Sequence, residues 1–161
     1  MLISKTPYRL SLFGGGSDTR DSLNKSGDKV LNLAMNKFSH CIVRILPKFF
    51  ESRHRLIYSK VEDLNNLKDS EHPVLRKILD YMNINEPNGI EIIHSGDLPS
   101  RSGVGSSSSF TVGLLNVLTK LLTNETLDKK QLANAAIEIE RDVLNEPGGI
   151  QDQVAAAFGG V

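Results

Sequence analysis

The sequence lacks several features that would point to particular classes of protein. Its 161 residues include one cysteine, Cys41, so neither an internal disulfide nor a cysteine-based zinc site can form. Nineteen basic and nineteen acidic residues leave no net charge, which gives no indication of nucleic acid or an anionic membrane as a partner. No apolar run approaches the roughly 18 residues of a membrane span, and residues 1–13 lack the apolar core of a signal peptide. We therefore expect a cytoplasmic globular protein without nucleic-acid or membrane partners.

Two common kinds of catalytic site are also without support. The four histidines, His40, His54, His72 and His94, show no metal-ligand spacing. A serine hydrolase of the Gly-x-Ser-x-Gly type is unsupported, because the sequence after Gly105 lacks the closing glycine.

The order of the hydrophobic patterns predicts an α+β fold in one domain. Strand patterns cover Leu2–Phe13, a pair over Val30–Phe38 and Cys41–Leu46, then Arg55–Tyr58 and residues 90–94. The polar residues 63–71 are expected to form a loop. One helical pattern begins at Pro73, and a second runs from the glycine-rich stretch to about Leu122. A third begins at an Asp128–Gln131 capping box, and a short fourth covers Gln151–Phe158.

The stretch Leu98–Phe110 carries the clearest functional signal. It is a Gly- and Ser-rich turn between an alternating strand and an amphipathic helix. Such a turn presents unpaired backbone N–H groups and the positive end of a helix dipole, and both favour bound phosphate. It has neither the Lys of GxxxxGK[ST] nor the third glycine of the dinucleotide fingerprint. A plain turn or linker is the alternative interpretation.

Four charged residues are candidates for chemistry. Arg9 precedes the triple glycine at 14–16, and Asp18 closes that turn. Asp152 follows a turn at the start of a helix, and Glu140 lies beside the apolar face of the preceding helix, near its C-terminal end. Each also has a structural explanation: Asp18 and Asp152 as caps, Glu140 as a solvated charge and Arg9 as an exposed strand residue.

Three motifs, in this order, resemble those of the GHMP kinases, a family of small-molecule kinases that includes galactokinase, mevalonate kinase and homoserine kinase. Residues 99–108, PSRSGVGSSS, are similar to the family's phosphate loop, Pro-x-x-x-Gly-Leu-Gly-Ser-Ser-Ala. Residues 7–18, PYRLSLFGGGSD, resemble the N-terminal sugar motif, and residues 149–153, GIQDQ, resemble the segment with the catalytic aspartate. The resemblance implies that 1–161 form the family's N-terminal domain, of the ribosomal-protein-S5-domain-2-like fold, without the C-terminal domain.

Within the family, residues 14–18 and the residues after the loop look most like the D-glycero-D-manno-heptose 7-phosphate kinases, which phosphorylate an anomeric hydroxyl. Ile150 departs from that branch, which tends to carry Lys there, and agrees with galactokinases. Three interpretations therefore stay open: a heptose-phosphate kinase, a galactokinase- or fucokinase-like enzyme, and a non-catalytic nucleotide-binding module.

The resemblance also implies cofactors and residue roles. ATP and Mg²⁺ are the expected cofactors, and a sugar or sugar phosphate is the expected substrate. The roles carried over are nucleotide binding by Pro99, Gly103, Val104, Gly105, Ser106, Ser107 and Ser108; metal binding by Ser107 and Glu140; and substrate binding by Gly15, Gly16, Ser17, Asp18, Asn32 and Asp152. Asp152 would accept or polarise the hydroxyl proton, with Arg9 holding it ionised. An N-terminal domain by itself is expected to be nearly inactive, and to self-associate through the surface that the second domain would cover.

Overall fold

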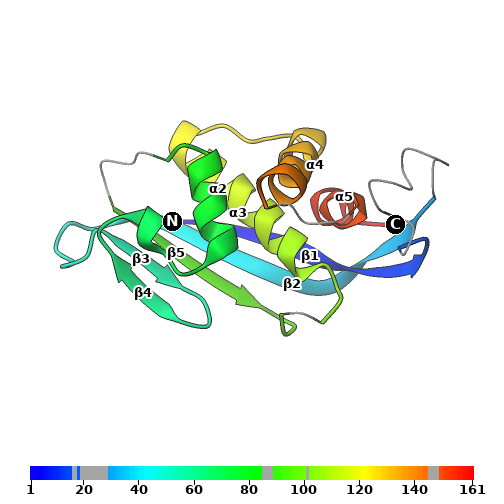
Figure 1. The fold of residues 1–161 in the computed structure, drawn as a ribbon, viewed down its shortest axis with the longest axis horizontal. Helices are drawn as coiled ribbons and strands as arrows, with labels where there is room; N and C mark the ends of the chain where they lie inside the picture. Colours follow the sequence, from blue (N-terminus) through cyan, green and yellow to red (C-terminus); the bar gives the residue numbers. More distant parts are fainter. Residues whose placement is uncertain (16–17, 19–28, 85–88, 101, 145–148) are drawn as a thin grey trace.

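The computed structural model describes residues 1–15, 18, 29–84, 89–100, 102–144 and 149–161, arranged as one sheet with helices on one of its faces (Figure 1). The strands are β1 Leu2–Phe13, β2 Leu31–Leu46, β3 His54–Ile57, β4 Val61–Leu64 and β5 Gly89–Gly96, in the sheet order β1-β2-β5-β3-β4. β3 runs parallel to β5, and the other neighbours are antiparallel. The predicted α+β class is confirmed.

β2 is one continuous strand of 16 residues, so the predicted pair Val30–Phe38 and Cys41–Leu46 is wrong. Residues 37–40, KFSH, contain none of the Gly, Pro, Asn or Asp residues that favour a reversal of the chain. Ser39 instead pairs with Thr6 of β1 on one side and with Gly96 of β5 on the other. The strand therefore runs through the middle of the sheet, where both of its edges are hydrogen-bonded.

The predicted loop at 63–71 is also partly wrong, because it overlaps β4 and contains a short 3₁₀ helix, η1 Leu67–Asp69. β4 forms a hairpin with β3, and Arg55 Nε donates to Asp63 Oδ1 across it at 2.7 Å. Opposite charges directly across an antiparallel pair stabilise it modestly. Polar residues are common on an edge strand, so polar composition alone does not distinguish such a strand from a loop.

The helices are α2 Pro73–Tyr81, α3 Ser106–Thr123, α4 Lys129–Glu138, its π-helical continuation η2 Ile139–Val143, and α5 Gln151–Phe158. The predicted capping box of α4 is confirmed by both of its bonds, Gln131 N to Asp128 Oδ1 at 2.8 Å and Asp128 N to Gln131 Oε1 at 3.0 Å. The predicted bounds of α5 are confirmed as well. None of the helices in the described ranges is both long and apolar enough to cross a lipid bilayer.

α3 occupies the centre of the helical layer, and its buried side chains form much of the core. Leu114 and Leu118 are fully buried, and burying such a side chain contributes about 1.5–3 kcal/mol. A Cβ on Gly113 would lie 2.7 Å from Thr6 Oγ1, so only glycine allows α3 to approach β1 this closely. Ser109 Oγ also donates to Pro7 O at 2.8 Å. These contacts fix the N-terminus of α3 beside β1, where Arg9 lies.

Candidate active site

Arg9 and Asp152 form an ion pair between β1 and the first turn of α5. Arg9 Nε donates to Asp152 Oδ1 at 2.6 Å, and Nη2 donates to Oδ2 at 2.8 Å. This bidentate arrangement is the strongest geometry for an Arg–carboxylate pair. The side chains are 14% and 26% exposed, so the pair is partly buried and still accessible to a ligand. The interpretation of Arg9 as an exposed strand residue is therefore wrong.

The glycine-rich loop lies directly against this pair. Arg9 Nη1 donates to Gly103 O at 2.9 Å, and Arg9 N donates to Val104 O at 3.0 Å. Gly103 and Gly105 have φ of 74° and 70°, in the left-handed region that favours glycine. A Cβ on Gly105 would lie 3.0 Å from Arg9 Cγ and 3.4 Å from Asp152 Oδ2. The loop backbone can therefore approach both charged groups only because glycine stands there.

The N-terminus of α3 is open for an anion. Its N-cap residue, Gly105, has no side chain to accept a hydrogen bond from the first turn. Among the described residues, no side chain accepts from the backbone N–H of Ser106, Ser107 or Ser108. The positive end of an 18-residue helix dipole therefore faces outward beside Arg9. Pro99 lies at the start of the loop, where its carbonyl accepts from Ser102 Oγ at 2.7 Å.

Asp18 caps α5, as its structural interpretation expected. Its Oδ1 accepts from Ile150 N at 3.1 Å, and its Oδ2 accepts from Gln151 N at 2.9 Å. The residue is 4% exposed. A Cβ on Gly149 would lie 2.0 Å from Asp18 Cγ, so glycine is needed beside the carboxylate. Both oxygens of Asp18 are therefore engaged with the helix that carries Asp152.

The other predicted substrate residues gather around Gln151. Asn32 Nδ2 donates to Gln151 O at 3.4 Å, Gln151 Nε2 donates to Gly15 O at 3.4 Å, and Ser11 Oγ donates to Gln151 Oε1 at 3.0 Å. A cavity of about 470 Å³ is lined by Asp18, Asn32, Gln151 and apolar side chains, and Asp152 is not among the lining residues. Gly16 and Ser17 lie outside the described residues.

Glu140 is 2% exposed, so the interpretation as a solvated surface charge is wrong. Its Oε2 accepts a hydrogen bond from Ser108 Oγ at 2.7 Å and another from Gln153 Nε2. The serine that contacts Glu140 is therefore Ser108, whereas Ser107, the predicted metal ligand, is exposed on the same turn. In the described ranges, no group of three or more His, Cys, Asp or Glu residues is arranged to hold a metal.

A cavity lined by aromatic rings, which the sequence did not predict, adjoins the glycine-rich loop. It has a volume of about 600 Å³ and is lined by Tyr8, Tyr58, Ser59, His72, Val74, His94, Ser95, Gly96, Leu98, Ser100, Ser106, Ser107 and Phe110. The Phe110 ring lies 4.5 Å from that of His94 and 5.2 Å from that of His72, centroid to centroid. Ser106 and Ser107 connect this cavity to the open end of α3.

The two histidines of this cavity both have a pKa below the ordinary value for histidine. Burial lowers the pKa of His94 to about 4, and the nearby His72 and His40 add to the effect. Burial also lowers the pKa of His72, whose Nδ1 accepts from Leu75 N at 3.1 Å and caps α2. Their spacing in the sequence matches no metal site and indicates no other role. Their available signal was position, because His94 lies on the strand that leads into the glycine loop.

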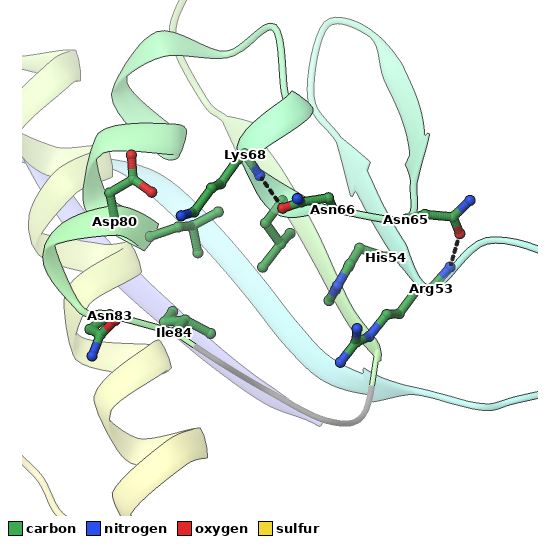
Figure 2. A pocket seen from close by; sticks show the side chains of 10 residues that line it. Arg53, His54, Asn65, Asn66, Lys68, Asp80, Asn83 and Ile84 are labelled. Atoms are coloured by element: carbon green, nitrogen blue, oxygen red, sulfur yellow. Dashed lines mark hydrogen bonds between the residues drawn. The ribbon is translucent and has the colours of Figure 1, made fainter.

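A third pocket, polar and of about 460 Å³, lies elsewhere, between the β3–β4 hairpin and the end of α2 (Figure 2). Arg53, His54 and Asn65 lie on one side of it, and Asp80 and Asn83 lie on the other. It contains none of the predicted site residues, so it is separate from the candidate site.

Comparison with known proteins agrees with the fold and the motifs. Residues 70–160 match the family model described as the GHMP kinases N terminal domain. The D-glycero-alpha-D-manno-heptose 7-phosphate kinase of Campylobacter jejuni subsp. jejuni serotype O:2 is 33% identical over 168 residues, covering 98% of this chain and 48% of that protein. A galactokinase of Pyrococcus furiosus is 43% identical over 65 residues, 40% of this chain and 18% of that protein.

Among solved structures, a D-glycero-D-manno-heptose 1-phosphate kinase from Bacteriodes thetaiotaomicron is similar with a TM-score of 0.82 at 30% identity, over 99% of this chain and 54% of that one. The N-terminal-domain fold expected from the resemblance is thereby confirmed. The chain spans about half the length of the heptose kinases that it matches.

Proposed function

The chain belongs to the GHMP kinase family, and from that membership we propose that it forms the nucleotide- and sugar-binding part of an ATP-dependent kinase acting on the anomeric hydroxyl of a sugar or sugar phosphate. One observation carries the proposal. The Arg9–Asp152 pair lies against Gly105, at the open N-terminus of α3. A site for the phosphate donor and a carboxylate able to receive a proton would thereby be adjacent.

The nucleotide phosphates would bind the N–H groups of residues 103–108, where loop and helix dipole both favour negative charge. The adenine would enter the aromatic cavity, which begins at Ser106 and Ser107. Neutral imidazole and phenyl rings suit stacking on a base, and the low pKa of His94 keeps its ring uncharged at neutral pH. The loop and the cavity meet at the N-terminus of α3, which supports the binding of one nucleotide there, with its phosphates at the loop and its base in the cavity.

Magnesium is the ion that the family implies, and the donors present suit it. Ser107 offers a hydroxyl on the exposed first turn of α3, and Glu140 offers a carboxylate bonded to the adjacent Ser108. Mg²⁺ prefers oxygen ligands and usually keeps water and phosphate in its shell, so two protein donors are sufficient. Ser107 and Glu140 would hold the ion, which when bound would neutralise charge on the β- and γ-phosphates.

Asp152 would act on the acceptor hydroxyl. The hydroxyl oxygen would form a bond to the γ-phosphorus while the bond from that phosphorus to the ADP oxygen breaks, and the hydroxyl proton would pass to Asp152. Each Asp152 oxygen accepts one bond from Arg9 and keeps a further lone pair for this proton. Arg9 would hold the carboxylate in place and offset charge on the transferring group.

We propose D-glycero-D-manno-heptose 7-phosphate as the acceptor, with the heptose kinase relatives as support. A galactose-type acceptor is the second candidate, favoured by Ile150 and by the local similarity to a galactokinase. A purely nucleotide-binding module has no need of Asp152 paired with Arg9, so the geometry argues against it. A panel of sugars and sugar phosphates, tested for ADP release with a protein in which this chain is joined to a GHMP C-terminal domain, separates the first two.

Nucleotide binding is tested first, on this chain. We expect magnesium-ADP to bind in isothermal titration, and Gly105→Ala to weaken binding by roughly tenfold or more, about 1.4 kcal/mol, because the added Cβ meets Arg9. Gly159→Ala is the matched control, since Gly159 has φ of 65° and its Cβ would meet nothing within 4 Å. Equal affinity of Gly105→Ala and the parent chain would refute the loop assignment.

A further inference from the structure

Three polar side chains from three different elements meet in the interior beside the candidate site. Ser108 of α3, Glu140 of η2 and Gln153 of α5 are 3%, 2% and 4% exposed. Glu140 Oε2 accepts from Ser108 Oγ at 2.7 Å and also from Gln153 Nε2. A carboxylate taken out of water is costly unless donors replace its hydration. Both donors hold the same oxygen, Oε2, and so help to orient the Glu140 carboxylate.

Gln153 directly follows Asp152, so the two side chains leave α5 in different directions. Successive residues of an α-helix are rotated by roughly 100°. Asp152 accordingly pairs with Arg9 of β1, while Gln153 reaches Glu140. The first turn of α5 thus connects both carboxylates to which the proposed function gives a role.

The backbone around Glu140 also has an unusual conformation. Glu140 lies in the π-helical turn η2, where Leu144 N donates to Ile139 O at 2.9 Å, five residues back. Turns of this kind are rare and often occur at functional sites. Glu140 therefore lies where the helix departs from regular α-helical hydrogen bonding, as residues of functional sites often do.

We infer that Gln153 is a positioning residue, which holds the Glu140 carboxylate in the orientation needed to bind magnesium with the nucleotide. The inference rests on the proposed function. Gln153 itself would touch neither substrate nor ion; it acts through Glu140. Ser108, on α3, would perform the same task as the second donor to the same oxygen.

The test is Gln153→Met, which keeps the side-chain length and removes the donor. ADP affinity is measured by isothermal titration of the chain with and without magnesium, which gives the gain in affinity due to the ion. We expect Gln153→Met to reduce that gain roughly tenfold, the usual lower bound for losing a partner of a metal ligand, and to leave magnesium-free binding unchanged. Gln131→Met, in the capping box of α4, is the matched control that should leave the gain intact.

A second series locates the effect at Glu140. In a Glu140→Gln background, adding Gln153→Met should change the magnesium gain no further, because the group that it positions is already gone. Two results would overturn the inference alone: a parent-like magnesium gain in Gln153→Met, or loss of magnesium-free binding along with it, which would indicate a merely structural role. A parent chain that binds no magnesium-ADP would instead overturn the proposed function and this inference with it.

Discussion

Replacing Asp18 provides a quantitative test of its role at the start of α5. Its two oxygens accept backbone N–H groups at 3.1 and 2.9 Å while the residue is 4% exposed. Hydrogen bonds to a charged group contribute about 1.5–3 kcal/mol each, and losing a capping side chain usually costs about 1–2 kcal/mol in total. Because the site is buried, we expect Asp18→Ala to lower the free energy of unfolding by about 2–4 kcal/mol. Asp18→Asn keeps one acceptor, and should cost about half as much.

Urea unfolding of the chain, followed by circular dichroism, measures this loss. With a slope of about 2 kcal/mol per molar urea, the Asp18→Ala midpoint should fall by about 1–2 M. Gly149→Ala should have a similar effect, because its Cβ would lie 2.0 Å from the Asp18 carboxyl carbon. Asp128→Ala removes the exposed cap of α4, and it gives for comparison the loss in free energy of unfolding when an exposed cap is removed. A midpoint for Asp18→Ala equal to that of the parent chain would refute the capping argument and return Asp18 to a purely substrate-binding role.

Four further outcomes are expected. Asp152→Asn in the protein joined to a GHMP C-terminal domain should abolish phosphoryl transfer, seen as ADP release, and retain nucleotide binding; normal turnover would leave Asp152 without a catalytic role. Because the pKa of His94 is lowered from 6.5 to about 4 on folding, the unfolded chain binds a proton more readily between these pH values; the free energy of unfolding should therefore fall by up to about 1.4 kcal/mol per pH unit from pH 6.5 down to about pH 4, and His94→Gln should flatten this slope in acid unfolding curves. Gly113→Leu should lower the thermal midpoint by several degrees, because its Cβ overlaps Thr6, and an unchanged midpoint would contradict that packing. We also expect light scattering to detect self-association that Phe158→Ser reduces, since Phe158 is 44% exposed; a monomer at all concentrations would exclude it.

Helix starts were predictable because their signals are local. A few adjacent residues determine the capping box before α4 and the bounds of α5, and the structure confirms both. The single long β2 was missed because strand continuity depends on partners far away in the sequence. Its central residues pair with β1 and β5, and the sequence of residues 37–40 does not indicate which strands lie beside them.

The burial of Glu140 is indicated by its position in the sequence, on the apolar face of the helix. Leu132, Ala133, Ala136 and Ile139 are buried, and Glu140 continues this stripe at helical spacing. A carboxylate on an apolar stripe requires partners, yet the sequence does not say which. Ser108 and Gln153 are 32 and 13 residues away from it, and only the packing of α3 and α5 brings them there. The aromatic cavity was beyond prediction for the same reason.

The separation of Arg9 and Asp152 by 143 residues has a consequence for the protein while it is being made. Arg9 lies on β1 and is synthesised well before its carboxylate partner in α5. Long-range contacts of this kind form only after the intervening chain has been ordered, at the cost of its entropy. A nascent chain that stops short of α5 would carry the glycine loop without the acid that faces it. The Arg9–Asp152 pair can therefore form only after synthesis has passed residue 152.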